Sequence, residues 1–179
     1  LSSNLPANNI HSFDNFNAQG GYDLLVKVHP SEPNMVYIGG TNLWRSTDGF
    51  TSPNNSMIIG GYFIGSVEGD GNWGVYKNHH PDQHDLLFLP SNDSIILSAT
   101  DGGVYKSYNT FQDTVVWTSL NNGYYTTQLY GVTVSRNANS NVLHGGFQDN
   151  GNFITFSGNP TAHWNMPFNG DGCFAGIAD

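Results

Sequence analysis

The chain has 179 residues, which is enough for one domain with a hydrophobic core. Charged residues make up only 11%, while 22 glycines and 13% aromatic residues favour short strands and tight turns over helices. Five Lys and Arg residues against fourteen acidic residues give a formal net charge of −9, which argues against nucleic acid or an anionic membrane as a partner. No apolar stretch is long enough for a membrane helix, and a single cysteine, Cys173, excludes an internal disulfide framework.

The predicted strands fall into three similar groups of four. Each group contains four short apolar runs, separated by turns that carry Gly, Asn, Asp or Pro. In chain order the runs are 24–28, 36–40, 43–46 and 57–59; then 86–89, 96–100, 104–107 and 115–117; then 129–134, 142–147, 152–154 and a run around Trp164. The end of the chain, 174–179, is predicted to be the first strand of a further group.

Four strands roughly every 45 residues are typical of the blades of a β-propeller. The sequence therefore predicts an all-β propeller fragment of about three four-stranded antiparallel blades plus the first strand of a further blade. A β-sandwich with accidental internal similarity is the alternative. The expected segments are a connection from a preceding blade (1–20), a blade with a Gly-rich insertion (21–78), two further blades (79–125 and 126–168) and the start of the next blade (169–179). A closed ring typically needs four to eight blades, so we expect the remainder of the propeller or another chain to complete it.

Several motifs resemble those of known propellers. Ser46-Thr47-Asp48-Gly49 resembles the Asp box of sialidase-like and sortilin-like propellers, and residues 107–111 form a weaker second copy. Further segments, in the same order along the chain, are similar to the large secreted propellers of Bacteroidetes-type bacteria: 20–24, 42–46, 80–85, 100–105, 121–123, 127–130, 145–151 and 170–172. The resemblance implies a secreted or cell-surface protein of the type IX secretion class. It also implies kinship with xyloglucan-hydrolysing glycosidases and sortilin-type domains.

Two aspartates are candidates for catalysis. Antiparallel strands place the turns between second and third strands, and the connections between blades, at one end of the blades. Asp101 and Asp149 both lie in such turns, and a pair of carboxyl groups can hydrolyse a glycosidic bond. The segment 100–105 also resembles the one that carries a catalytic aspartate in xyloglucanases. The alternative, which we favour, is that each aspartate stabilises its own tight turn.

Two groups of residues are candidates for binding ions. His80, Asp82 and His84 lie close together in the connection between the first two blades, and imidazole and carboxylate groups are ligands for transition metals. We favour a hydrogen-bond network that ties this connection to the neighbouring blade. Asp171 lies between two glycines and either binds Ca²⁺ or shapes a turn. No cofactor or metal is therefore favoured.

A ligand site with aromatic side chains is the remaining candidate. Tyr105, Tyr130 and Phe147 lie near the same connections as Asp171, and sugar rings stack on such side chains. The alternative is that these aromatic residues simply pack between blades. Sialidase activity is excluded for this segment because recognition of the sialic carboxylate needs clustered arginines, and the chain has only Arg45 and Arg136.

The predicted function is binding or assembly by an extracellular or cell-surface propeller segment without catalysis. The alternative is a xyloglucanase-like glycoside hydrolase that uses the paired aspartates. The expected partners are the rest of the propeller or another protein chain, with a polysaccharide as an alternative, but neither nucleic acid nor an inserted membrane. Because uncovered blade faces destabilise a repeat protein, we also expect the isolated chain to aggregate or to melt without cooperativity.

Overall fold

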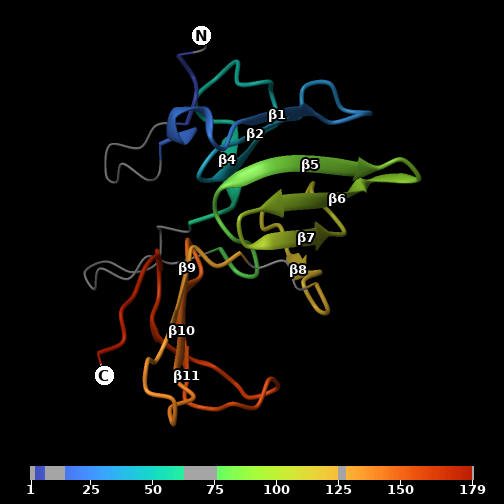
Figure 1. Cartoon of the computed structure of the whole chain (residues 1–179). Coiled ribbons are helices and arrows are strands. Elements are labelled where there is room, and N and C mark those ends of the chain that lie inside the picture. The colour runs from blue at the N-terminus through green and yellow to red at the C-terminus, as the bar shows by residue number, and fades with distance from the viewer. Residues whose placement is uncertain (1–2, 7–14, 63–75, 125–127, 179) are drawn as a thin grey trace. The chain divides into compact units, whose positions relative to one another are not determined.

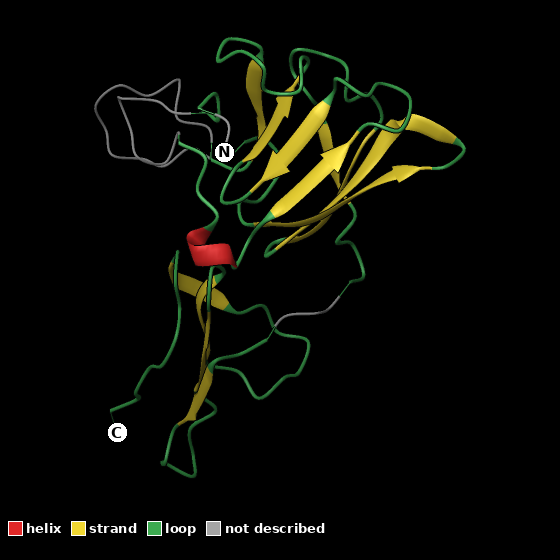
Figure 2. Cartoon of the chain, turned by 90° about the horizontal axis from the view of Figure 1, so that it is seen from above, coloured by secondary structure: helices red, strands yellow, loops and turns green. Residues whose placement is uncertain are grey.

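The computed structural model describes residues 3–6, 15–62, 76–124 and 128–178 (Figure 1). Regular structure in this part of the chain consists of strands and a 3-10 turn at Gln19–Gly21 (Figure 2). The strands are β1 (Leu25–Val28), β2 (Val36–Gly39), β3 (Leu43–Ser46), β4 (Ser56–Gly60), β5 (Gln83–Leu89), β6 (Asn92–Thr100), β7 (Gly103–Ser107), β8 (Trp117–Ser119), β9 (Gly131–Val134), β10 (Leu143–Phe147), β11 (Gly151–Thr155) and β12 (Asn165–Phe168). No helix among the described residues is long and apolar enough to span a membrane.

The strands form three four-stranded sheets, each a simple antiparallel meander. Their orders are β1-β2-β3-β4, β5-β6-β7-β8 and β9-β10-β11-β12. Consecutive strands pair throughout, as the short Gly- and Asn-rich connections require. The prediction of an all-β chain with three four-stranded antiparallel sheets is therefore confirmed.

The chain divides into two compact units, Leu1–Tyr124 and Tyr125–Asp179. The first unit contains two sheets that share one hydrophobic core. Strand alternation directs one set of side chains from each sheet into this core. Its fully or nearly fully buried members are Leu25, Tyr37, Leu43 and Ile59 from the first sheet, and Leu86, Ile96, Tyr105, Val115 and Trp117 from the second.

Directed polar contacts fix the two sheets of the first unit against each other. The Trp117 indole Nε1 donates a hydrogen bond to the backbone oxygen of Ile59 at 2.6 Å. The buried Arg45 guanidinium donates to the backbone oxygens of Thr110 and Gln112 in the connection between β7 and β8. A buried Arg is costly unless such acceptors satisfy it, so these contacts specify how the sheets meet.

The first sheet has apolar side chains on its other face as well. Val26 pairs with Ile38, and Ile38 with Trp44, so these three project to the same side, away from Leu25 and Tyr37. Val26 is 62% exposed and Val28, on the same face, is 53% exposed. Sheets with apolar side chains on both faces are usually covered on both faces.

The tight turn between β2 and β3 shows why a glycine is needed there. A Cβ atom on Gly40 would lie 2.0 Å from the backbone oxygen of Asn17. The same oxygen accepts a hydrogen bond from the backbone N–H of Thr41 at 2.8 Å. The segment that precedes the first sheet therefore runs directly against this turn, and only a residue without a side chain permits that approach.

The second unit contains the third sheet. Its β12 is exposed at all four positions, and Val132 and Val134 of β9 are each 58% exposed. The predicted further strand at the end of the chain is absent from the described residues: 169–178 carry no regular structure. A strand is held by its ladder of hydrogen bonds, and this segment makes only isolated contacts, such as Gly172 N–H to the Phe147 oxygen at 2.8 Å. Most of the Gly-rich insertion predicted at 60–78 lies outside the described residues.

Candidate functional site

Three aspartates meet at one end of the first two sheets. Asp23 leads into β1, Asp82 leads into β5, and Asp101 lies in the β6–β7 turn. Strand alternation predicts this shared end, because the connections into first strands and the turns after second strands occur at the same end of a meander. Asp48, in the β3–β4 turn, lies at the opposite end of its sheet.

Asp82 is held by the first sheet although it precedes the second. Its backbone N–H donates to the Thr41 oxygen at 2.9 Å, and the Gln19 side-chain Nε2 donates to its Oδ1 at 2.6 Å. Only 6% of Asp82 is exposed. Burial, followed by the neighbouring charges of Asp23 and Asp101, raises the pKa of Asp82 to about 7. This carboxyl group therefore keeps its proton to a much higher pH than an ordinary aspartic acid.

Asp23 is fully buried and has the poorest polar surroundings of the three. By strict hydrogen-bond geometry neither carboxyl oxygen has a partner among the described residues. The nearest polar groups are its own backbone N–H and the Asp82 carboxyl, which lower the pKa of Asp23, but burial outweighs them and raises it. Two adjacent buried carboxyl groups cannot both stay charged without a proton or a cation between them.

Asp101 is bound by residues outside its own turn. The Tyr22 hydroxyl lies 3.1 Å from both carboxyl oxygens, and His84 Nε2 lies 2.5 Å from Oδ1. The turn itself is shaped by other groups: Thr100 Oγ1 accepts the Gly102 N–H, and Asn121 Oδ1 accepts the Val104 N–H. The hydrogen bonds of the Asp101 side chain therefore link the β6–β7 turn to the segment before β1 and to the start of β5.

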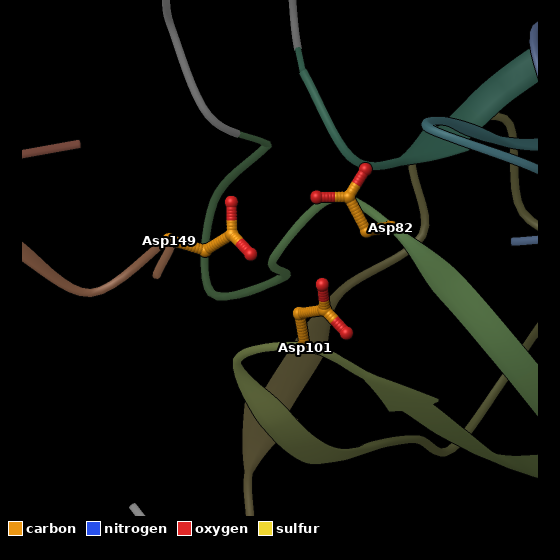
Figure 3. A group of neighbouring side chains, drawn as sticks. All are labelled: Asp82, Asp101 and Asp149. Carbon is orange, nitrogen blue, oxygen red and sulfur yellow. The ribbon is translucent and has the colours of Figure 1, made fainter. Parts of the chain in front are cut away.

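Figure 3 shows the Asp82 and Asp101 carboxyl groups, whose nearest oxygens lie within 4.8 Å of each other. Asp149, which the figure also labels, belongs to the second unit, where it lies in the turn between β10 and β11. There the backbone N–H of Asp149 donates to the carboxylate of Asp171 at 3.3 Å. The cluster described for the first unit therefore consists of Asp23, Asp82 and Asp101, with His84 beside them.

The histidines expected near Asp82 have three different surroundings. His79 is buried between Tyr105 and Trp117, its Nε2 lies 3.0 Å from the Ser98 hydroxyl, and burial lowers its pKa to about 3. His80 lies against the backbone of Gly102, with Nδ1 3.0 Å from the Pro81 oxygen. Only His84 contacts the carboxyl cluster. The three residues of the predicted set, His80, Asp82 and His84, are therefore not all brought together, because the His80 ring contacts the backbone of its own loop.

The first residues of β5 are tied to the first sheet and to the residues that follow its second strand. Gln83 N–H donates to the Gly40 oxygen at 2.9 Å. The Lys27 ammonium lies 2.8 Å from the Asp85 carboxylate, with both side chains largely exposed. Backbone contacts therefore carry most of this junction, since an exposed ion pair contributes under about 1 kcal/mol.

The Asp box in the β3–β4 turn is a self-contained turn. Ser46 Oγ donates to Asp48 Oδ1 at 2.9 Å and accepts the Phe50 N–H at 2.9 Å. Asp48 Oδ2 accepts from the side chains of Ser52 and Asn55. Hydrogen bonds from Asn55 and Ser52 hold the pKa of Asp48 well below its usual range. The side chains that donate hydrogen bonds to the Asp48 carboxylate all lie close to it in the chain, at the ends of β3 and β4 or in the turn between them, which points to a structural role.

The aromatic residues predicted to bind a ligand are separated. Tyr105 is 8% exposed and its hydroxyl donates to the Gly102 oxygen, so it belongs to the core of the first unit. In the second unit Tyr130 is 52% exposed, and Phe147 makes an edge contact with Phe153 at 5.4 Å between ring centroids. A hollow of about 440 Å³ in the first unit is lined by Ile58, Tyr76, Val115 and Trp117 among others, and by none of the three aspartates of the cluster.

Asp23 and Tyr22 were missed as site residues by reasoning from the sequence, although the repeat contains a signal. Tyr22-Asp23-Leu24-Leu25 aligns with His84-Asp85-Leu86-Leu87. Tyr22 and His84 thus occupy corresponding positions, contact each other edge to face at 5.2 Å, and both bind Asp101. The corresponding acids differ: Asp23 is buried, whereas Asp85 is exposed.

Comparison with protein-family models, curated proteins and solved structures gives no match for this chain. The resemblance to Asp-box propellers therefore rests on the motifs alone.

Proposed function

We propose that the three sheets are blades of a β-propeller and that this segment acts in binding or assembly rather than in catalysis. The supporting observation is the first sheet, which is apolar on both faces and leaves Val26 and Val28, at the β1 side of one face, largely exposed while Ile38 on the same face is buried. In a propeller such a face packs on the neighbouring blade. The partner that fits it is another sheet of the same kind, from the rest of the propeller or from a second chain.

The surroundings of the acidic residues also favour a non-catalytic role. Asp23 and Asp82 are buried, and Asp101 is held by Tyr22 and His84. A glycosidase needs two carboxyl groups on either side of a substrate-sized groove. The secreted or cell-surface location belongs to the same proposal and is supported by the resemblance to secreted propellers.

The second candidate is a glycoside hydrolase. The observation in its favour is that Asp82 has a pKa of about 7 close to a second carboxyl group, Asp101. A carboxylic acid that stays protonated near neutral pH is the usual proton donor in such enzymes. In this proposal Asp82 and Asp101 are the catalytic pair, whereas the sequence suggested Asp101 and Asp149.

Sedimentation velocity over a range of concentrations tests the assembly proposal. We expect the wild-type chain to self-associate through its uncovered faces and Val26→Lys to reduce that association. Thr118→Lys, an exposed substitution elsewhere in the first unit, is the matched control and should leave association unchanged. A wild-type chain that stays monomeric at every concentration contradicts the proposal.

Release of reducing sugar from xyloglucan tests the second candidate. We expect no release above the level of a heat-treated sample. Release that Asp82→Asn and Asp101→Asn both abolish, with circular dichroism unchanged, would establish the hydrolase in place of the binding role.

A further inference from the structure

We propose that His79 acts as a pH switch at the junction of the first two sheets, which stay together while its ring is neutral and separate when the ring takes up a second proton. Acid would then open two sheets that share one hydrophobic core. The switch lies inside the first unit, apart from the exposed sheet face that supports the proposed function, and neither proposal needs the other.

The His79 ring is enclosed between the two sheets. It is 1% exposed, and its centroid lies 5.2 Å from that of Tyr105 and 4.2 Å from that of Trp117, both in the second sheet. The first sheet contributes Gly60 of β4, where a Cβ atom would lie 2.4 Å from His79 Nδ1. The residue before it, Ile59, accepts the hydrogen bond from the Trp117 indole that links the sheets. The ring therefore reaches water only if the sheets part beside this bond.

The hydrogen bonds around the ring define its tautomer. The Gln83 side-chain Nε2 donates to the His80 oxygen at 2.9 Å, so Oε1 is the acceptor end of that amide. Oε1 accepts the Ser98 hydroxyl at 3.3 Å, and a hydroxyl has only one proton to donate. Ser98 Oγ must therefore accept from His79 Nε2, which lies 3.0 Å away. This network assigns the ring proton to Nε2 and leaves Nδ1 unprotonated.

Nδ1 of His79 is the atom that a second proton would have to join. It is buried and has no hydrogen-bond partner among the described residues. A protonated imidazole has two donors, so the new N–H would be left unsatisfied in a dry site. His29, which is also 1% exposed, differs because its Nδ1 accepts the Ser31 N–H at 3.3 Å and its Nε2 lies 3.1 Å from the Asp93 oxygen.

The groups around the ring do not compensate a positive charge on it. The elements packed against it are β4, β6, β7, β8 and its own segment, which face it with Gly60, Ser98, Tyr105, Trp117 and His80. Of these only Tyr105 and His80 can ionise, and burial raises the pKa of Tyr105, so this residue stays neutral in acid. Burial, followed by the charge of His80, lowers the pKa of His79 to about 3.

Urea unfolding between about pH 7 and pH 4 tests the switch. A group whose folded pKa is lowered in this way stabilises the fold fully above its unfolded pKa, and that stabilisation is lost as pH falls. We expect the folding equilibrium constant of wild type, relative to that of His79→Gln, to fall about tenfold per pH unit below about pH 6. Glutamine keeps a donor for Ser98 but takes up no proton. Titration of Asp82 occurs in both chains and cancels in the ratio.

Hydrogen exchange of the Trp117 indole N–H locates the opening. Acid should reduce the protection of this proton more in wild type than in His79→Gln, because the bond to Ile59 breaks when the sheets part. His163→Gln, which removes an exposed imidazole in the second unit, is the control and should keep the pH dependence of wild type. Equal pH dependence of stability and of protection in wild type and His79→Gln overturns the proposal.

Nitrogen NMR spectra of the imidazole rings give a measurement that does not depend on cooperative unfolding. We expect the His79 ring of the folded chain to stay neutral, with its proton on Nε2, to below about pH 5. If His79→Gln does not fold, these spectra of wild type decide the test. A His79 ring that titrates in the folded chain at the ordinary pKa of about 6.5 overturns the proposal.

Discussion

Replacing Asp82 with asparagine should stabilise the chain at neutral and alkaline pH when divalent cations are absent. Asparagine keeps an acceptor for the Gln19 amide and supplies a permanent donor toward Asp23. It also suits the backbone, because Asp82 has a φ of 63° and Asn tolerates that left-handed conformation as well as Asp does. The substitution therefore removes a buried negative charge without changing the side chain's shape.

The size of the effect follows from the pKa of Asp82, which burial and the adjacent acids raise from 3.8 to about 7. A group whose folded pKa is raised stabilises the fold fully below its unfolded pKa, and that stabilisation is lost as pH rises through the folded pKa. A difference of roughly three pKa units corresponds to about 4 kcal/mol. The free energy of unfolding of wild type should therefore fall by up to about 4 kcal/mol, relative to Asp82→Asn, between about pH 4 and pH 7.

Urea unfolding followed by circular dichroism, with chelator present, measures this difference between pH 4 and pH 8. Carboxyl carbon shifts in NMR report the pKa of Asp82 directly and do not depend on cooperative unfolding. Asp85→Asn is the control, because the Lys27 ammonium and a hydrogen bond from it lower the pKa of this exposed acid. Its removal should cost under about 1 kcal/mol at neutral pH. If the free energy of unfolding varied with pH in the same way for wild type and Asp82→Asn, the reasoning would be refuted.

Four further substitutions test the packing of the first unit by urea unfolding. Ser46→Ala removes the three hydrogen bonds of the Ser46 hydroxyl in the β3–β4 turn and should cost about 1–2 kcal/mol, whereas Ser107→Ala, with contacts of 3.4–3.5 Å, should cost clearly less; equal losses would contradict this. Trp117→Phe loses the bond to Ile59 and leaves space in the core, so we expect a loss of about 2 kcal/mol or more, and a smaller loss than for Ser107→Ala would be inconsistent with it. Lys27→Ala should change stability by under about 1 kcal/mol at any salt concentration, and a larger loss would assign the ion pair more weight than its exposure allows.

The sequence was sufficient to predict the sheets and the end at which the acids gather. The periods of apolar residues and turn residues identify twelve strands, and antiparallel pairing then requires Asp82 and Asp101 to share one end. Both statements need only local pattern and connectivity. The same reasoning placed Asp48 at the opposite end, and the strand order agrees with it.

The individual contacts of the site depended on features that the sequence does not reveal. Asn78 and Asp82 have φ values of 55° and 63°, a left-handed backbone conformation that the residue types alone do not reveal, on either side of His79 and His80. Close to these positions in the chain, His79 lies in the core and His84 contacts Asp101. The burial of Asp23 likewise depends on how closely the two sheets approach, and no pattern within a single repeat encodes that distance.

The different surroundings of Asp23 and Asp85 limit how far these repeats are interchangeable. The two residues occupy the same place in neighbouring repeats, yet one is enclosed between sheets and the other faces solvent beside Lys27. A hybrid chain in which the second repeat is copied from the first would place Tyr22-like and Asp23-like residues where His84 and Asp85 now lie, and it would lose both His84 and the Asp101 carboxylate that it contacts, because both belong to the second repeat. The two modules have thus become specialised halves of one junction, and protein engineers who wish to concatenate or shuffle them must keep each in its own position.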